Sequence, residues 1–587
     1  MTLGTIIDAN CLHPGLIMIA MGLLVMALPE RLRRPAYIAA PLLALACSLQ
    51  LNESSEMVYR ISSKLSIDMI SFDRLSLIFM TAFCIVSLIA AIYSAGSNNR
   101  FEMGFALMYA GSNMGVVLSG DVLSMIIFWE LSAIASCYVV YARRTRKSTR
   151  AAFRYILVHG FGGNMLLVGI ISYIAKYGMD IANITGAQDF TFWMIFIGVA
   201  VNAAVPPLNS WMPDAYPEST IGGTIYLASF TTKSAIYVMI RFFAGTEWLV
   251  YVGAFMAIYG ILMALLENDL RRLFCYHIIS QLGYIVASLA MGPGYGIDGA
   301  AAHTFNNIMY KGTLLMCAGA VLYATGRRKI SELGGLGRQM PLTAVCFLIA
   351  SFAISGMPFL NGFASKALVM HAVSEGGYEL VSFLLTTASV GTWMSIALKI
   401  NYFVFFGKPV SGKPFPAEEL KSVPVNMKIG MVLGAAACTV TGVMPKLVYN
   451  LTPSMTDGHP FTAMHIVEYL VLFAGGTVIF FLFINKMKVH DQLSLDFDWF
   501  YRALLDRFIL WISTSIHKLF IFFDKVVLRS CQYMGKHLGD PYLWTEKSQN
   551  RYIRSISFEN EDRLIGNVII AIVFTFVVML VVSAAVL

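Results

Sequence analysis

Two interrupted apolar stretches decide the fold of this chain: FIGVAVNAAVPPLNSWMPDAYPEST at 196–220 and IASFAISGMPFLNGFASKALVMHA at 349–372. Both are apolar enough to be helical, but the first contains Pro206 and Pro207 and the second contains Pro358. Proline lacks a backbone N–H and disrupts the turn before it, so each stretch should form two half-helices. Breaks at matching positions of two repeats are typical of transporters.

The composition is that of a multi-pass membrane protein. Of 587 residues, 57% are hydrophobic and 13% are charged, against roughly 25% charged in soluble domains. The net charge of +8 comes from Lys and Arg in short loops, a pattern that encodes membrane orientation and does not indicate nucleic-acid binding. The first apolar run lacks the features of a cleaved signal peptide. We expect an integral protein of a bacterial-type cytoplasmic membrane.

Sixteen apolar runs are long enough to cross about 30 Å of hydrocarbon, so the expected fold is all-α. They lie at 14–29, 35–51, 74–95, 103–119, 122–141, 153–175, 190–210, 219–243, 247–267, 272–291, 299–324, 342–360, 380–406, 427–449, 462–486 and 563–586. Basic clusters follow runs 1, 5, 9 and 11, so this end of the bundle is predicted to be cytoplasmic and the N-terminus external.

The interrupted runs are the seventh and the twelfth, and this spacing of five predicts the domain organisation. We expect two inverted five-helix units, runs 4–8 at 101–245 and runs 9–13 at 246–408. The remaining expected parts are helices 1–3 at 1–100, helices 14 and 15 at 409–489, a lateral segment at 490–560 and a C-terminal anchor helix at 561–587.

The lateral segment has an amphipathic pattern. Asp498, Arg502 and Asp506 recur every four residues beside aromatic and aliphatic side chains, which indicates a helix lying in the membrane interface. As one helix of about 40 residues it would reach roughly 60 Å, far enough to cross neighbouring helices or a partner protein. A pair of shorter surface helices fits the pattern equally well.

Charged residues within apolar runs point to a route for ions or protons. Glu130, Lys233, Lys311 and Lys366 each interrupt such a run, and a charge at the bilayer centre costs at least about 2.5 kcal/mol. A desolvated lysine releases its proton more readily, and a nearby acid shifts that balance by its Coulomb interaction. The alternatives are that Lys233 and Lys311 extend to the interface and that Lys366 caps a half-helix.

Five motifs occur in a recognisable order: FWELSAIASCYVVY at 128–141, NAAVPPLNSWMPDAYPE at 202–218, ENDLRRLFCYHIISQLGY at 267–284, HTFNNIMYKGTLL at 303–315, and GGLGRQMP through GFASK at 334–366. With them the chain resembles the antiporter-like membrane subunits shared by respiratory complex I, membrane-bound hydrogenases and Mrp-type Na+/H+ antiporters, including the D-type subunit of the last. The resemblance covers helices 3 to 13. It implies two inverted five-helix units and a buried Glu and Lys chain that conducts protons laterally.

The resemblance also implies a role for each site residue. Glu130 matches a helix-5 glutamate that modulates a neighbouring lysine, and Lys233 matches a bridging lysine or histidine on helix 8. His303 and Lys311 match the histidine and lysine of helix 11. Lys366 matches the residue after the helix-12 break that connects to one side of the membrane.

The chain departs from the family pattern at the helix-7 break. Asn202 stands where most relatives have a lysine, and Asn209 and Asn307 replace later histidines of the motifs. Asparagine cannot carry a proton charge, so the first unit lacks its usual Glu and Lys partnership. Either Lys233 pairs directly with Glu130, which we favour, or the first half-channel is altered, blocked or adapted to another ion.

Three further residues are secondary candidates. Asn202 belongs to them because of its place at the break. His159, within ILVHGFGGN, could relay protons, although such a histidine more often only packs. Lys399 could join the route, but Lys399 and Lys428 are expected to be interfacial anchors.

The sequence predicts no catalytic residue, metal site or cofactor in this chain. A Rossmann glycine pattern, a Walker loop, a CxxC pair and an axial-ligand arrangement are all missing from it. Whether it serves an NADH:quinone oxidoreductase-like or hydrogenase-like enzyme is left open. We expect a proton- or Na+/H+-translocating subunit that works with other membrane subunits in the lipid bilayer. The alternatives are a non-pumping scaffold of a redox complex and a subunit for uptake of inorganic carbon or another small anion.

Overall fold

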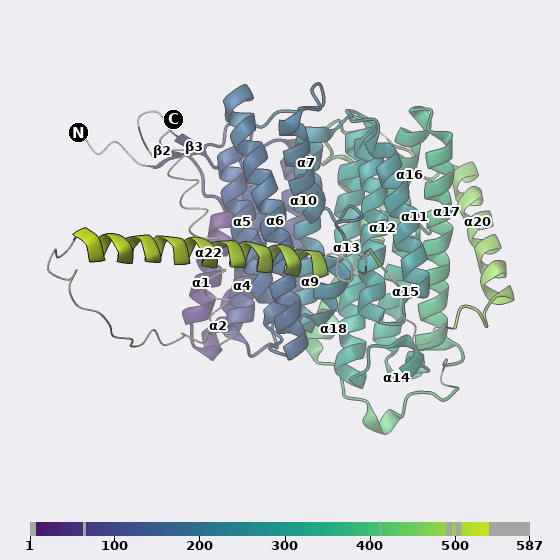
Figure 1. Cartoon of the computed structure of the whole chain (residues 1–587). Helices are drawn as coiled ribbons and strands as arrows, with labels where there is room; N and C mark the ends of the chain where they lie inside the picture. Colours follow the sequence, from purple (N-terminus) through teal and green to yellow (C-terminus); the bar gives the residue numbers. More distant parts are fainter. Residues whose placement is uncertain are drawn as a thin grey trace. The chain divides into compact units, whose positions relative to one another are not determined.

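The computed structural model describes residues 7–60, 62, 66–410, 412–456, 458–488, 496, 497, 499 and 506–538. Within these ranges the protein is almost entirely helical, and the helices from α1 to α20 run side by side (Figure 1). The chain forms two compact units, residues 1–502 and 503–587. The predicted last span, 563–586, and the C-terminal anchor at 561–587 lie outside the described residues.

The N-terminal part combines three helices with a small antiparallel sheet. The helices are α1 (Pro14–Ala27), α2 (Glu30–Ser48) and α3 (Arg74–Ser94), and the strands, in sheet order, are β1 (Ile7–Ala9), β2 (Met57–Arg60) and β3 (Ser66–Asp68). Tyr59 pairs with Ile7 on one side and Ile67 on the other. The all-α prediction missed this sheet, because strands of three or four residues give too few alternating positions to recognise.

The first half of the bundle holds seven α-helices and a 3-10 turn. They are α4 (Arg100–Leu118), α5 (Val122–Tyr141), α6 (Arg146–Tyr177), α7 (Phe190–Asn202), α8 (Trp211–Ala215), η1 (Tyr216–Glu218), α9 (Ile221–Ser229) and α10 (Thr231–Phe243). The interruption predicted at Pro206 and Pro207 is confirmed, since it separates α7 from α8. The predicted continuous helix 219–243 is wrong, because the chain breaks at Phe230 between α9 and α10.

The second half also contains long helices and an interrupted one. Its elements are α11 (Leu249–Leu266), α12 (Leu270–Leu289), α13 (Tyr295–Thr325), η2 (Ile330–Glu332), α14 (Leu336–Gln339), α15 (Pro341–Ser355), α16 (Asn361–Glu375), α17 (Glu379–Thr392) and the π-helical turns η3 (Trp393–Leu398) and η4 (Asn401–Phe406). The interruption predicted at Pro358 is confirmed between α15 and α16. The π-helical turns were not predicted.

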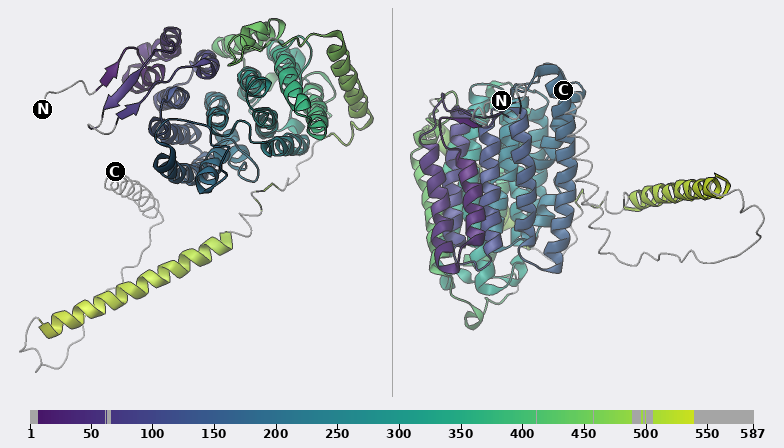
Figure 2. Two further views of the ribbon diagram at one scale, coloured as in Figure 1. Left: turned by 90° about the horizontal axis from the view of Figure 1, so that it is seen from above. Right: turned by 90° about the vertical axis from the view of Figure 1, so that its left-hand side faces the viewer.

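Three helices and a short 3-10 turn complete the bundle: η5 (Ala417–Glu419), α18 (Val425–Val443), α19 (Lys446–Tyr449) and α20 (Ala463–Leu482). Eight helices of the described residues are long and apolar enough to cross a membrane. Close packing between them uses glycine. A Cβ on Gly15 of α1 would lie 2.5 Å from the Gly111 carbonyl of α4, so only glycine permits this approach. Seen end-on, the helices of the bundle lie side by side (Figure 2).

Residues 503–587 form the other unit, of which the structure describes α22 (Asp506–Leu538). This helix is continuous over 33 residues, so the single-helix interpretation holds for this stretch of the lateral segment. Large apolar side chains such as Trp511, Phe520 and Phe523 are exposed along it, beside Lys518 and Asp524. It therefore has the composition of a helix that binds a membrane surface or a partner.

The basic loops of the bundle meet at one end, which we call the basic end. Arg154 of α6 forms a bidentate contact with Asp214 of α8 at 2.7 and 2.8 Å. Arg328, which follows α13, pairs with Glu218 at 2.9 Å and with Asp269 at 2.8 Å. These contacts join α6 to the segment after α7, and that segment to the loops after α11 and α13, so basic residues from several parts of the chain gather at one end.

Candidate functional site

Lys233 lies at the unpredicted break between α9 and α10. The chain turns at Phe230, and the amide of Thr231 donates to the hydroxyl of Tyr109 at 2.8 Å. The ammonium of Lys233 donates to the carbonyl of Ala228, in the last turn of α9, at 2.6 Å. Lys233 is fully buried. Side chains thus supply hydrogen bonds at a helix end that no proline or glycine marks.

Lys366 lies beside the break after α15, at the start of α16. That helix ends at Ser355, and Gly356 follows with φ +92°. The Lys366 ammonium donates to the Ser355 carbonyl at 3.1 Å and to the Ser389 hydroxyl of α17 at 3.0 Å, and it lies 4.9 Å from the centre of the Tyr284 ring. Lys366 therefore caps the half-helix, as one interpretation of the sequence held, and it does so while fully buried.

The break after α7 carries no cation. α7 ends at Asn202, Ala204 has φ +52°, and a cis peptide bond joins Pro206 to Pro207. Asn202 and His159 are buried neighbours, yet Asn202 Oδ1 and both ring nitrogens of His159 lack a hydrogen-bond partner within the described protein. Unpartnered polar atoms gathered in a buried site are typical positions for ordered water.

The Glu130 carboxylate lies against α6 in space that is free because residue 163 is glycine. A Cβ on Gly163 would lie 2.0 Å from Glu130 Oε1. Among the described residues no ion pair joins Glu130 to Lys233, because that ammonium donates to the carbonyl of Ala228 and to the hydroxyl of Thr232, at 3.0 Å. The direct Glu130–Lys233 pair that we favoured from the sequence is therefore not formed in this structure.

His303 sits in a hydrogen-bonded group at the centre of the second half. Its Nδ1 is 2.9 Å from the Ser365 hydroxyl of α16, and its Nε2 is 3.2 Å from Gln281 Oε1 of α12. The Tyr310 hydroxyl donates to the same Gln281 oxygen at 3.3 Å. Ser365 directly precedes Lys366, so this group reaches the second break.

Lys311, two turns further along α13, lies between the other two lysines. Its ammonium donates to the Phe274 carbonyl at 3.4 Å, and it is close enough to Lys233 and Lys366 for the charge of each to act on it. Its side chain is 1% exposed. The interpretation in which Lys311 extends to the membrane interface is therefore wrong, and burial excludes it for Lys233 as well.

Two residues of this region were misjudged or overlooked. Lys399 was expected to be an interfacial anchor, but it is fully buried and donates to the carbonyls of Leu265 at 2.8 Å and Glu267 at 3.1 Å. His277, inside a motif that we quoted without giving this residue a role, is fully buried and 2.9 Å from the Ser395 hydroxyl. Lys399 lies seven residues before the end of the predicted run 380–406, which could have indicated burial, but only packing decides it.

Two cavities reach toward this row of buried polar groups. At the basic end, a cavity of about 320 Å³ is lined largely by charged residues, among them Lys147, Arg272, Arg328, Glu218 and Asp496. Asp496, from the lateral segment, accepts hydrogen bonds from the hydroxyls of Tyr259 and Tyr276. This cavity also borders Ser210 and Pro213 beside the first break.

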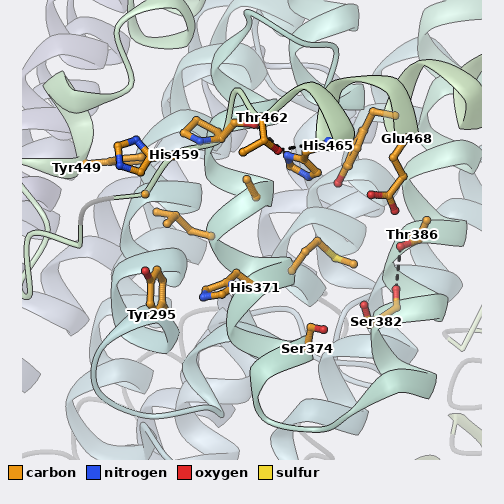
Figure 3. Close-up of a pocket in the computed structure, with 16 residues that line it drawn as sticks. Tyr295, His371, Ser374, Ser382, Thr386, Tyr449, His459, Thr462, His465 and Glu468 are labelled. Atoms are coloured by element: carbon orange, nitrogen blue, oxygen red, sulfur yellow. Dashed lines mark hydrogen bonds between the residues drawn. The ribbon is translucent and has the colours of Figure 1, made fainter.

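The second cavity, of about 560 Å³, opens among α16, α17 and α20 (Figure 3). His371, His465 and Glu468 lie around it, together with Tyr469. The ring of Tyr469 also packs against the backbone of the second break, beside Lys366. Each cavity is thus associated with one of the two interrupted helices.

Residues 119–392 match the family described as NADH:quinone oxidoreductase/Mrp antiporter, transmembrane domain. This region contains both breaks and all the buried lysines described above except Lys399. Residues 119–392 therefore form a domain of this family. The resemblance drawn from the motifs is therefore confirmed, and the protein is an integral multi-pass membrane protein with an antiporter-type transmembrane domain.

Members of this family with known names resemble the chain over much of its length. A Na(+)/H(+) antiporter subunit of Alkalihalophilus pseudofirmus is 28% identical over 507 residues, which cover 74% of this chain and 62% of that protein. Across the first five curated relatives, the chain spans between 39% and 76% of their length.

Solved structures show the same fold. A chain of the membrane-bound sulfane sulfur reductase, an archaeal respiratory membrane complex, superposes with a TM-score of 0.70 at 21% identity and covers 91% of this chain. A chain of the Mrp complex from Dietzia sp. DQ12-45-1b gives a TM-score of 0.68 at 20% identity and covers 78%.

Proposed function

We propose that this protein translocates protons, alone or in exchange for Na+, as one subunit of a multi-subunit membrane complex. The route follows the buried groups Glu130, Lys233, Lys311, His303 and Lys366. The observation that carries the proposal is the row of three buried lysines, each held by carbonyl or hydroxyl groups with no ion pair among the described residues.

Buried lysines of this kind are expensive to keep charged. Desolvation without a carboxylate partner favours the neutral amine, so each lysine can release and regain a proton when a neighbouring charge changes. Lys311 feels the charges of both Lys233 and Lys366, so a proton on one lysine opposes a proton on the next. This repulsion would pass protons from lysine to lysine along the row.

The proposal includes the finer architecture predicted from the sequence. Residues 101–245 and 246–408 form two inverted five-helix repeats, which we call the first and second repeat, within a total of sixteen membrane spans. The matched interruptions after α7 and α15 support this division, as does a lysine at 2.6 to 3.1 Å from a helix-end carbonyl in each repeat. The basic end would face the cytoplasm, with the N-terminus outside.

Membership of a larger complex is part of the same proposal. The relatives named above are a subunit of an antiporter and chains of respiratory and Mrp complexes. The exposed apolar residues of α22 supply a surface for neighbouring subunits or for the membrane. Any redox chemistry would belong to partner subunits.

Proton flux tests the function in inverted vesicles that contain the complete native complex, with and without a sodium gradient. We expect Lys311→Ala and Glu130→Gln to reduce flux at least about tenfold, the scale of losing one proton-transfer group. Asn202→Lys should raise flux, because it returns a cation to the first break. A response to the sodium gradient would identify exchange with Na+.

Lys428→Ala is the matched control, since Lys428 is an exposed lysine near the start of α18 and is not part of the row. Its flux should equal that of the wild type. Wild-type flux in Lys311→Ala, Glu130→Gln and Asn202→Lys together would refute translocation and leave the chain as a scaffold. Uptake of labelled bicarbonate with no proton flux would instead favour the small-anion alternative.

A further inference from the structure

We propose that Lys399 and His277 form a second proton relay, which supplies Lys311 from the basic end through the second repeat. This inference rests on the proposed function and extends it to two residues outside the proposed route of Glu130, Lys233, Lys311, His303 and Lys366. Its consequence is that the neutral Asn202 at the first break does not stop proton supply from the basic end.

Lys399 is buried next to the basic end. Its ammonium donates to the carbonyls of Leu265 and Glu267, where α11 finishes. The Glu267 carboxylate lies 3.3 Å from the Arg272 guanidinium, and Arg272 lines the cavity of about 320 Å³ at that end. Glu267, itself nearly buried, and Arg272 thus lie between Lys399 and the cavity.

The backbone around Lys399 is irregular in a way that favours a functional role. Lys399 stands between the π-helical turns η3 and η4, and π-turns within helices occur frequently at functional sites. Ser395 lies four residues before it on the same segment, with its hydroxyl 2.9 Å from His277 Nε2. The segment therefore brings Lys399 and the hydroxyl that contacts His277 into one short stretch.

His277 belongs to α12, which packs against α13, the helix that carries Lys311. Phe274, which accepts the Lys311 hydrogen bond, is on the same helix one turn earlier. His277 Nδ1 has no hydrogen-bond partner within the described protein although it is fully buried. The ring can thus take a proton on one nitrogen and release one from the other, with a water molecule at Nδ1.

The two repeats place these residues in corresponding helices. Glu130 lies eight residues after α5 begins at Val122, and His277 lies seven residues after α12 begins at Leu270, each on the second helix of its repeat. Lys233 and Lys399 are both on the fifth helix, and both adjoin irregular backbone. The pair Lys399 and His277 therefore occupies the positions that Lys233 and Glu130 hold in the first repeat.

Protons are conserved in this relay. A proton from the cavity reaches the neutral amine of Lys399, and the ammonium passes one through the Ser395 hydroxyl to His277 Nε2. The imidazolium then releases a proton from Nδ1 through water to the amine of Lys311. Before the next transfer, the ring returns to its first tautomer by exchanging protons with the same groups. After one proton has passed, each group has returned to its original protonation state.

Three variants of the native complex test this relay: Lys399→Ala, Lys399→Arg and His277→Gln. Arginine keeps a positive charge and hydrogen-bond donors but does not release a proton, and glutamine keeps a hydrogen bond to Ser395 without titrating. A structural role would therefore tolerate Lys399→Arg and His277→Gln, whereas a relay would not. Proton flux and the amount of assembled complex are measured for each, with Lys428→Ala as the control.

We expect all three relay variants to assemble and to lose at least about tenfold in flux, with Lys428→Ala unchanged. Flux within about twofold of the wild type in assembled Lys399→Arg or His277→Gln, while Lys311→Ala is inactive, would overturn the relay and leave the proposed function intact. If neither Lys399 variant assembles, His277→Gln alone decides. Full flux in Lys311→Ala would remove the proposed function and the relay with it.

Discussion

The two helices that are interrupted near proline carry different side chains at their breaks. After α15, a fully buried lysine donates to the carbonyl of Ser355, the last residue of the half-helix. At the break after α7, the half-helix ends at Asn202, whose Oδ1 has no partner within the described residues. One break therefore carries a titratable cation and the other carries only neutral groups.

Under the proposed division into two repeats, this difference would give each repeat a separate task. The first repeat keeps its lysine one helix later, at Lys233, where the chain breaks at Phe230 without proline or glycine. The second repeat has buried lysines both at the break and at Lys399. Positive charge is thus concentrated in the second repeat, and the first repeat contributes Glu130, the one carboxylate of the proposed route.

The largest expected effect is a loss of assembled complex on substitution of Arg271. This residue of the second repeat binds the segment that follows the first break. Its guanidinium donates to the carbonyls of Tyr216, Pro217, Ser219 and Thr220. Arg271→Ala leaves these buried acceptors unpaired, at about 1–3 kcal/mol each. We expect most of the assembled complex to be lost, as measured by its yield after mild purification.

Arg327→Ala is the control for this prediction. Arg327 Nη1 is 3.8 Å from Glu332, and its side chain is 54% exposed, so the pair contributes at most about 1 kcal/mol. Equal yields of the Arg271 and Arg327 variants would show that the breaks do not depend on contacts between the repeats.

The second prediction compares the proton flux of variants at the two breaks. Lys366→Ala should reduce proton flux at least about tenfold, because it removes a titratable group from the route. Asn202→Ala should change flux less than about twofold, since the amide carries no proton charge. The measurement is flux per assembled complex in inverted vesicles. Similar losses of flux in both variants would contradict the proposed difference between the two breaks.

The smallest effect concerns the space around Glu130. In Gly163→Ala the new Cβ would lie 2.0 Å from Glu130 Oε1, so the carboxylate must move away from its present position. We expect a loss of about two- to fivefold in flux with normal assembly, because Coulomb coupling weakens gradually with distance.

Gly160→Ala provides the matched comparison on the same helix, since a Cβ there meets nothing within 4 Å. Its flux should remain that of the wild type. If Gly163→Ala and Gly160→Ala behave alike, the position of the Glu130 carboxylate does not influence the lysines.

Much of the fold could be predicted from the sequence because the bilayer restricts the possibilities. A spanning segment must satisfy its own backbone hydrogen bonds, so long apolar runs become helices, and proline shows where they stop. The predicted run 122–141 matches α5 residue for residue, and the interruptions at Pro206, Pro207 and Pro358 were all located. The helix at 563–586 and the roles of the site residues remain predictions.

Other features depend on contacts between helices that are distant in the chain. The break at Phe230 carries no local signal, because its compensation comes from Tyr109 on α4 and from the Lys233 side chain. In the same way, Lys399 resembles an interfacial lysine until the end of α11 is seen to accept its hydrogen bonds.

By itself, the sequence determined that this chain crosses a membrane, where two of its helices break and which charges interrupt its apolar runs. Those properties follow from composition and local backbone chemistry. Only the tertiary structure decided which buried charges are neighbours: Lys311 near Lys233 and Lys366, and His277 near Ser395. The physical reason is that the partners of a buried polar group lie on other helices, and packing alone selects those helices.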